Sequence, residues 1–501
     1  MTVYNMSRKT FIILIGLALL GFFLRSYLYP DNLFFGSEQG RDFKVIRDIV
    51  VSHKFTLIGS KTDIAGVFHG PIFYYLATIP FFLSHGDPYI IALFFIAIQS
   101  LTVFVIYLLA QELTGHRRVA LISAFLFTVS YGAISYSRWL SNPPLTIPIS
   151  AVFFLFFLRF LKGRKWSLIG AAISYGLMGQ AEFINFLLVA ATGSVIAFRY
   201  YKKIIILPKI FLFFSFCIAL LFSVGNFVLF DIRHEFLIIK SVFGLLSGTK
   251  GYYISLSQSF ISTYSMFINS SMNILGLPNV QITTLILCSI FVVLIMLIRK
   301  NHYYSILLSW LLIPNIILIV LRHGALEQLF VFLVVGILMG VSVGIDYVWR
   351  KCCPTLGILL LMLLVFSNIS LLRVSLFTNY RIFFQSTQPE LRYKDQMDVV
   401  EYVYKRANGR KFYFQSYTIP YFWQDGWEYL FWQKGMKNNL VLPDEKHDEL
   451  LYVIIQRDRS NPRFQYDWYK NTVSTWGLLQ STMTFGELTV EERVKEGQHE
   501  T

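Results

Sequence analysis

Long apolar runs dominate the chain, and short polar links separate them. About twenty apolar residues in a helix cross the hydrocarbon core of a bilayer, because a helix rises about 1.5 Å per residue across about 30 Å. The runs therefore predict a mainly α-helical, polytopic membrane protein with about eleven spans. The predicted spans are 11–28, 89–110, 119–137, 144–161, 167–179, 183–197, 206–230, 282–298, 304–321, 329–345 and 356–372.

The first apolar run is expected to remain in the mature protein as a span. It follows Arg8 and Lys9, and it is longer than the apolar core of a usual signal peptide. Arg25 stands near its end, where a signal peptide would carry a cleavage site of small residues. We therefore predict a retained first span with the N-terminus on the cytoplasmic side.

Basic residues recur in alternate links, and this pattern sets the predicted topology. The formal net charge is +15, which in a soluble protein would suggest nucleic acid as a partner. Here the pairs and triplets all fall on one side if the spans are threaded in order, as the positive-inside rule requires. The excess charge therefore predicts anionic lipid headgroups as neighbours, and no nucleic acid. The basic groups are Arg8/Lys9, Arg117/Arg118, Lys162/Arg164/Lys165, Arg199/Lys202/Lys203, Arg299/Lys300 and Arg350/Lys351.

Threading leaves three large segments outside the membrane. Two are loops, 29–88 and 231–281, and the third is everything after 372. Within the second loop, the apolar stretch 236–246 is too short to span and reads as a helix lying at the interface. We expect residues 1–372 to form the transmembrane domain.

The chain changes character after residue 372, where charge and turn residues return. Residues 394–406 have the spacing of an amphipathic helix, and 427–435 of a short one. Residues 411–417 and 450–456 read as strands. Residues 373–501 are therefore predicted to form a small extracytoplasmic α/β domain. The aromatic residues between 413 and 432 suit either an ordinary core or a sugar-binding or interfacial surface.

None of the four cysteines lies in a segment predicted to be outside. The sequence therefore predicts no extracellular disulfide framework. Together with the short inner loops, this is compatible with the inner membrane of a bacterial cell.

The first outside loop carries the most informative polar pattern. From Ser37 onward it has helical spacing, and Glu38 and Asp42 fall on one stripe with Ile46 and Ile49. Two carboxylates turned toward an apolar body are unfavourable unless they are paired, bind a cation or face a cavity. A catalytic site is one reading of this pattern. The other is that helix N-terminal amides and nearby arginines, such as Arg41, satisfy both groups.

Further polar candidates lie at the predicted outer ends of spans. Each has an ordinary reading as a cap, a headgroup contact or a turn residue. Each could also hold an anionic leaving group or orient a substrate. These candidates are His69, Arg138, Asn142, Glu182, Arg233 and His234.

These features resemble the GT-C superfamily of membrane glycosyltransferases. Within it, the chain looks like the bacterial branch related to protein O-mannosyltransferases and lipid A aminoarabinose transferases, which is glycosyltransferase family 39-like. The resemblance rests on the acidic motif after the first span, His-Gly-Pro-Ile-Phe-Tyr-Tyr at 69–75, Ser-Arg-x-x-Ser-Asn-Pro at 137–143, and the outside domain after the last span. The family usually has Asp-Glu at the acidic motif. Ser37-Glu38 stands here, so Asp42 or Asp31 would have to supply the missing acid.

The resemblance implies transfer of one sugar from a polyprenyl-phosphate donor to a lipid, glycan or protein acceptor, with inversion at the anomeric carbon. Asp42 or Glu38 would act as the base, and Arg138 and Arg233 would bind the donor phosphate. Arg41, His69, Asn142, Glu182 and His234 would give polar support. No cofactor is predicted with certainty, and a divalent cation stays open. A lipid or polysaccharide transporter and a catalytically inactive member of the same fold are the alternatives.

Overall fold

The computed structural model describes residues 7–205, 208–247, 253–374, 391–419, 423–444 and 449–495. The chain forms two compact units. Unit 1 holds Met1–Tyr27, Thr56–Tyr75 and Phe94–Val374, and unit 2 holds Leu28–Phe55, Leu76–Leu93 and Ser375–Thr501. The last segment of unit 2 begins at Ser375, close to the predicted boundary at residue 372, and unit 2 also includes two earlier segments, which lie mostly in the first outside loop.

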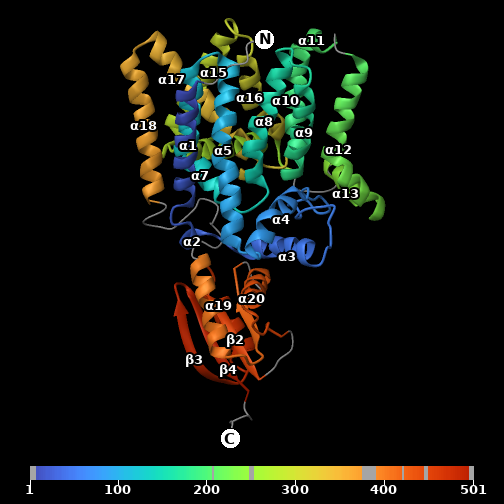
Figure 1. The fold of residues 1–501 in the computed structure, drawn as a ribbon, viewed down its shortest axis with the longest axis vertical. Helices are drawn as coiled ribbons and strands as arrows, with labels where there is room; N and C mark the ends of the chain where they lie inside the picture. The colour runs from blue at the N-terminus through green and yellow to red at the C-terminus, as the bar shows by residue number, and fades with distance from the viewer. Residues whose placement is uncertain are drawn as a thin grey trace. The chain divides into compact units, whose positions relative to one another are not determined.

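Every apolar run predicted as a span forms a helix or a pair of helices. Among the described residues, eight helices are long and apolar enough to cross a membrane, or nine if one bent pair counts as a span. The other two predicted spans are helices of 15 residues each. The helices lie side by side in Figure 1. Their bounds are α1 (Arg8–Ser26), α4 (Ile72–Ser84), α5 (Pro88–Thr114), α6 (Arg117–Val129), α7 (Tyr131–Ser137), η1 (Pro143–Leu145), α8 (Thr146–Leu161), α9 (Ser167–Ala181), α10 (Asn185–Arg199), α11 (Tyr201–Ile205), α12 (Lys209–Arg233), α13 (Leu237–Leu246), α14 (Leu256–Leu275), α15 (Val280–Ile298), α16 (Tyr304–Leu321), η2 (Glu327–Leu333), α17 (Val334–Lys351) and α18 (Pro354–Arg373).

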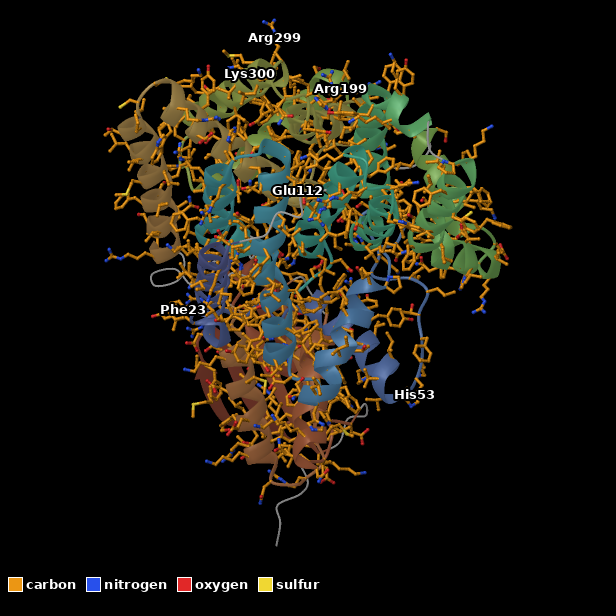
Figure 2. The ribbon with its side chains drawn as sticks, turned by 45° about the horizontal axis from the view of Figure 1, so that its top comes forward. Phe23, His53, Glu112, Arg199, Arg299 and Lys300 are labelled. Carbon is orange, nitrogen blue, oxygen red and sulfur yellow. The ribbon has the colours of Figure 1, made fainter. Side chains whose placement is uncertain are left out.

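The basic links gather at one end of unit 1. Arg118 lies 3.4 Å from the carboxylate of Asp346, which also pairs with Arg350 at 2.6 Å. Lys203 donates to the carbonyl of Leu161 at 3.0 Å, which joins two further links. Figure 2 shows three more basic side chains at this same end, Arg199, Arg299 and Lys300. The contacts agree with the predicted threading, in which these links share one side.

A buried arginine holds the bend between α6 and α7. The two helices meet at 58°, and the end of α6 exposes backbone carbonyls that no helical amide reaches. Arg25 of α1 donates to the carbonyls of Phe127 and Thr128 at 3.1 and 3.3 Å, and to the hydroxyl of Ser137 at 3.0 Å. Its side chain is fully buried. These bonds go to neutral oxygens, so the guanidinium is a structural brace for the bend.

The second outside segment contains a helix, α14, that the sequence pattern did not predict. Ser259 near its start donates to the carbonyl of Ile319 at 3.0 Å, and Leu275 at its end accepts from Asn368 at 2.7 Å. Ile319 and Asn368 lie near the ends of α16 and α18 that the threading assigns to the outer side. Because both ends of α14 bond to that side, the helix leaves the predicted order of crossings unchanged. The helix predicted at 236–246 is present as α13, and its place at the membrane interface stays a prediction.

Unit 2 contains the predicted α/β fold. Its sheet has the order β1-β2-β4-β3, with β1 parallel to β2 and the other neighbours antiparallel. Both predicted strands and both predicted helices are present, whereas the hairpin of β3 and β4 was not predicted. Residues 420–422 of the predicted aromatic cluster lie outside the described residues. The bounds are α2 (Tyr29–Asn32), α3 (Ser37–Val51), α19 (Tyr393–Ala407), β1 (Tyr413–Tyr417), α20 (Asp425–Asn438), β2 (Leu450–Gln456), α21 (Pro462–Trp468), η4 (Tyr469–Val473), β3 (Leu478–Phe485) and β4 (Leu488–Val494).

Candidate functional site

The predicted helix of the acidic motif is present as α3, but its buried face differs from the prediction. Asp42 is 3% exposed, whereas Glu38 is exposed. A Cβ added to Gly40 would lie 2.3 Å from the backbone nitrogen of Gly426, so the backbones of α3 and α20 are nearly in contact there. This approach centres the buried face on Gly40 and Phe43. The prediction that Glu38 and Asp42 share one buried stripe is therefore wrong.

Asp42 is paired with the residue before it. Arg41 donates from Nε to Oδ1 of Asp42 at 2.9 Å, and Nη2 of Arg41 lies 2.9 Å from the same oxygen. Both contacts end on one carboxylate oxygen, so the guanidinium holds the group in a defined orientation. Arg41 thus contacts the candidate base, a contact that both readings of the acidic motif allow.

A short hairpin in the first outside loop brings His69 to the link between α9 and α10. The backbone N–H of His69 donates to the carbonyl of Ser60 at 2.9 Å, and that of Gly70 donates to the carbonyl of Gln180 at 2.8 Å. A Cβ on Gly70 would lie 2.8 Å from Cα of Gln180, so only glycine allows this approach. As a result, Nδ1 of His69 lies 3.9 Å from Oε1 of Glu182.

Glu182 is a buried carboxyl at the end of α9. It is 5% exposed, and burial raises its pKa from 4.5 to about 8, with a further upward contribution from the charge of Asp63. The C-terminal end of a helix also disfavours negative charge. Glu182 lies in the link between α9 and α10, outside the predicted membrane spans. Burial therefore favours the protonated, uncharged form of the side chain.

Asn142 belongs to the same neighbourhood. Its Nδ2 donates to the hydroxyl of Ser60 at 3.3 Å, and the side chain is 1% exposed. Ser60 is the residue whose carbonyl accepts from His69. The structure therefore brings together three of the predicted supporting residues, His69, Asn142 and Glu182, from three separate links of unit 1.

Arg138 lies buried at the end of α7. It is 2% exposed, and Nη1 donates to the carbonyl of Tyr27 at 3.2 Å. The preceding residue, Ser137, accepts from Arg25. Two buried guanidinium groups thus flank Ser137, on the side of unit 1 predicted to be outside. Such a concentration of positive charge favours an anionic ligand.

The structure places Arg233 and His234 at the end of α12, where both are exposed. The ring of His234 stacks on Phe230 with centroids 3.9 Å apart, and its Nδ1 lies 2.8 Å from the carbonyl of Phe230. Phe230 also meets Phe68 at 5.5 Å. Among the described residues, neither Arg233 nor His234 forms a hydrogen bond or ion pair with Glu182. His234 is connected to the loop that carries His69 through the stacking of Phe230 and Phe68.

Two acidic residues on the same side were not among the candidates. Glu327 accepts from the hydroxyl of Tyr136 at 2.8 Å, and Asp63 accepts from Gln328 at 3.4 Å. Their signal in the sequence was an acid within an outside turn, as for Glu182. Within the described ranges, no three His, Cys, Asp or Glu side chains group as ligands for a metal ion.

The sequence and the fold of this chain are similar to those of known proteins. Residues 68–226 match the family model of dolichyl-phosphate-mannose-protein mannosyltransferase. No curated protein sequence matches the chain. The fold matches ArnT from Cupriavidus metallidurans bound to undecaprenyl phosphate, with a TM-score of 0.61, 10% identity, and 98% of this chain and 99% of that chain covered. The apo form of ArnT from the same organism matches with a TM-score of 0.59 and 11% identity, and the match covers 98% of this chain and 99% of that chain. The oligosaccharyltransferase AglB from Archaeoglobus fulgidus matches with a TM-score of 0.49 and 14% identity, and the match covers 79% of this chain and 58% of that chain.

Proposed function

We propose that this protein, whose chain has the GT-C fold of membrane glycosyltransferases, transfers a single sugar from a polyprenyl-phosphate donor to an acceptor at the outer face of the membrane. The observation that carries the proposal is the buried polar cluster of His69, Asn142 and Glu182 with Arg138 nearby in sequence. All four residues fall within the segment 68–226 that matches the mannosyltransferase family model. Buried polar and charged groups of this kind cost free energy in an apolar bundle unless they are paired or bind a ligand, so they indicate a functional site.

The donor class rests on the fold and on charge. A protein of the same fold, ArnT, is described as bound to undecaprenyl phosphate. Arg138 is the proposed ligand of the donor phosphate, because a buried guanidinium binds a phosphate more strongly than a hydrated one does. Arg233 is exposed, and we propose it as a secondary contact for the phosphate group.

The chemistry would proceed by direct displacement. Asp42 or Glu38 would accept the proton of an acceptor hydroxyl while its oxygen attacks the anomeric carbon of the sugar. The bond between that carbon and the phosphate oxygen would break, and the polyprenyl phosphate would leave with the electron pair. A guanidinium would stabilise the negative charge of the leaving phosphate. A divalent cation could supply the same stabilisation.

We further propose that the enzyme works in a bacterial inner membrane, with the end of unit 1 that carries the basic links toward the cytoplasm. The gathering of those links at one end supports this orientation under the positive-inside rule. The acceptor is a lipid, a glycan or a protein, and the membrane is the site of encounter.

The test is transfer of label in membranes. Polyprenyl phosphates carrying radiolabelled sugars would be offered with a cell-envelope extract, and label that leaves the lipid would be measured. We expect transfer by the wild type and its loss in Glu38→Gln/Asp42→Asn. Glu401→Gln is the matched control, because Glu401 is an acid on the exposed surface of unit 2 with 71% of its side chain accessible.

Two results would overturn the proposal. One is the absence of transfer by the wild type with every sugar offered, provided that the protein is inserted and folded. The other is equal transfer by the wild type and the double variant. Either result would favour the alternative functions, a transporter or a catalytically inactive member of the fold.

A further inference from the structure

The polar cluster of unit 1 contains several buried acceptor oxygens. Among the described residues, Oε2 of Glu182, Oδ1 of Asn142 and Oδ1 of Asn185 are buried and have no hydrogen-bond partner. Asn185 and Asn142 are each 1% exposed. A buried acceptor without a donor costs free energy, and in native structures such a group usually faces an ion, a water molecule or a ligand that the protein was built to hold.

The three oxygens belong to one connected neighbourhood. The backbone N–H of Asn185 donates to the carbonyl of Glu182 at 2.9 Å, so the two side chains leave adjacent positions at the start of α10. Asn142 reaches the same place through Ser60 and the His69 hairpin, and η1 contacts α9. A fourth oxygen, Oε1 of Gln99, is also without a partner in the described chain, and Nε2 of Gln99 donates to the carbonyl of Pro144 at 2.6 Å.

The chemistry of this set selects its ligand. Amide and carboxyl oxygens accept hydrogen bonds, so the missing groups must be donors. Glu182 is the only ionisable group in this set, and within the described residues no three His, Cys, Asp or Glu side chains gather as metal ligands, so the set favours hydroxyl donors over a cation. A cluster of neighbouring O–H groups, as on a sugar ring, supplies several donors at the spacing of adjacent hydroxyls.

We propose that Asn142, Glu182 and Asn185 bind the hydroxyl groups of a sugar. The inference rests on the proposed function, because it assigns the sugar-bearing part of the substrate to this cluster. The sugar could come from the polyprenyl-phosphate donor or from an acceptor glycan, since both present the same hydroxyl chemistry. The cluster then sets which sugar is accepted, because a hydroxyl that fails to reach an oxygen leaves that oxygen unpaired.

Binding measured on the purified full-length protein tests this inference. The probes are undecaprenyl phosphate, undecaprenyl phosphate mannose, undecaprenyl phosphate glucose and a soluble mannose tetrasaccharide. The readout is the dissociation constant from thermal unfolding at several ligand concentrations. For the wild type we expect one sugar-bearing lipid to bind about tenfold or more tightly than the sugar-free lipid.

Two variants remove the proposed contacts, and one serves as a control. Glu182→Met replaces the carboxyl by an apolar group of similar length, and Asn185→Leu replaces an unpaired amide by an apolar group of similar size. Both should keep the affinity for undecaprenyl phosphate while the preference for the sugar-bearing lipid disappears. Gln111→Met removes a buried acceptor without a described partner from α5, outside the cluster, and should keep the preference.

A second readout separates a binding role from a structural one. Without ligand, Asn185→Leu should unfold at the same temperature as the wild type or at a higher one, because it removes an unpaired buried oxygen. A variant that is more stable and yet loses the sugar preference has lost a binding contact. If the tetrasaccharide, and not the lipid-linked sugar, loses affinity in the variants, the cluster takes the sugar of the acceptor.

Three results would overturn the inference. If the wild type binds both lipids equally and does not bind the tetrasaccharide, the oxygens hold ordered water only, and the proposed function still stands. If the variants keep the preference of the wild type, sugar recognition lies elsewhere. If the folded wild type binds none of the probes, the proposed function fails together with this inference.

Discussion

Nδ1 of His69 lies 3.9 Å from Oε1 of Glu182. The histidine comes from a loop near the start of the chain, and the carboxyl group comes from the link between α9 and α10. The backbone bond from Gly70 to Gln180 fixes their approach. Changes in Glu182 should therefore report on the docking of the loop as well as on the site.

The stability of the protein should depend on pH through Glu182. Its pKa is raised from 4.5 to about 8 in the folded protein, whereas an unfolded chain ionises the group above its ordinary pKa. Between these values the folded state binds one more proton, so stability falls as pH rises, by at most about 1.4 kcal/mol per pH unit. The stabilisation is fully present below the ordinary pKa and is lost as pH passes the raised one.

Glu182→Gln imitates the protonated group at every pH. We expect the unfolding temperature of this variant, relative to the wild type, to rise between about pH 5 and pH 8 and to stay level above that. Thermal unfolding in detergent across this range is the measurement. Glu401→Gln on the exposed surface should show no such trend. If the unfolding temperatures of the wild type and Glu182→Gln change with pH in parallel, the pKa of Glu182 is not raised in the folded protein.

Single substitutions should distinguish the two candidate bases. Asp42 is buried and held by Arg41, whereas Glu38 is exposed. Because a catalytic base must be positioned, Asp42→Asn should lower the transfer rate about 10²- to 10⁴-fold. Glu38→Gln should change it less than about tenfold. The measurement is initial rate at saturating donor, and the reverse order of effects would assign the base to Glu38.

Arg138 and Arg233 should differ in their contribution to donor binding. Loss of a hydrogen bond to a charged group costs about 1.5–3 kcal/mol, so Arg138→Met should weaken binding of undecaprenyl phosphate by about ten- to hundredfold. Arg233→Met should have a much smaller effect, because Arg233 is exposed and hydrated. Arg138 also contacts the carbonyl of Tyr27, so the unfolding temperature of each variant must be measured beside its affinity. Equal effects on binding would contradict the assignment of Arg138.

Gly40 should be essential for the packing of α3 on α20. A Cβ there would lie 2.3 Å from the nitrogen of Gly426 and 2.4 Å from the carbonyl carbon of Asp425, and backbone atoms cannot move aside as a flexible side chain can. Gly40→Ala should destabilise unit 2 by about 1–3 kcal/mol, measured as protease sensitivity of unit 2. Gly16→Ala in α1 is the matched control, since nothing lies within 4 Å of its added carbon. Equal protease resistance of the two variants would show that the helices can separate at no cost.

The spans could be predicted from the sequence because the length of an apolar run is itself the physical requirement for crossing a bilayer. α14 was missed because serines, a threonine and asparagines interrupt its apolar pattern. Its start nevertheless carries a readable signal, since Ser255 and Gln258 form a capping box. The strands β3 and β4 have exposed and charged positions that give no clear alternation.

The candidate site was only partly predictable. His69, Asn142 and Glu182 were chosen because each is a polar residue in an outside link, but no local pattern shows that three links meet. The rotation of α3 was misjudged because contact between Gly40 and Gly426 decides it, and these residues are far apart in sequence. Asn185 was overlooked because an amide at the start of a helix looks like an ordinary polar terminus.

The hydrogen bonds of Arg25 can form only late in the synthesis of this protein. Its guanidinium bonds to Phe127, Thr128 and Ser137, all of which are synthesised more than one hundred residues later than Arg25 itself. At about 5–20 residues per second, α1 must wait roughly 5–20 seconds for these partners. During that interval the first helix needs water, lipid headgroups or the insertion machinery to solvate its charge. Biogenesis of the bundle should therefore be most vulnerable between the emergence of α1 and that of α7.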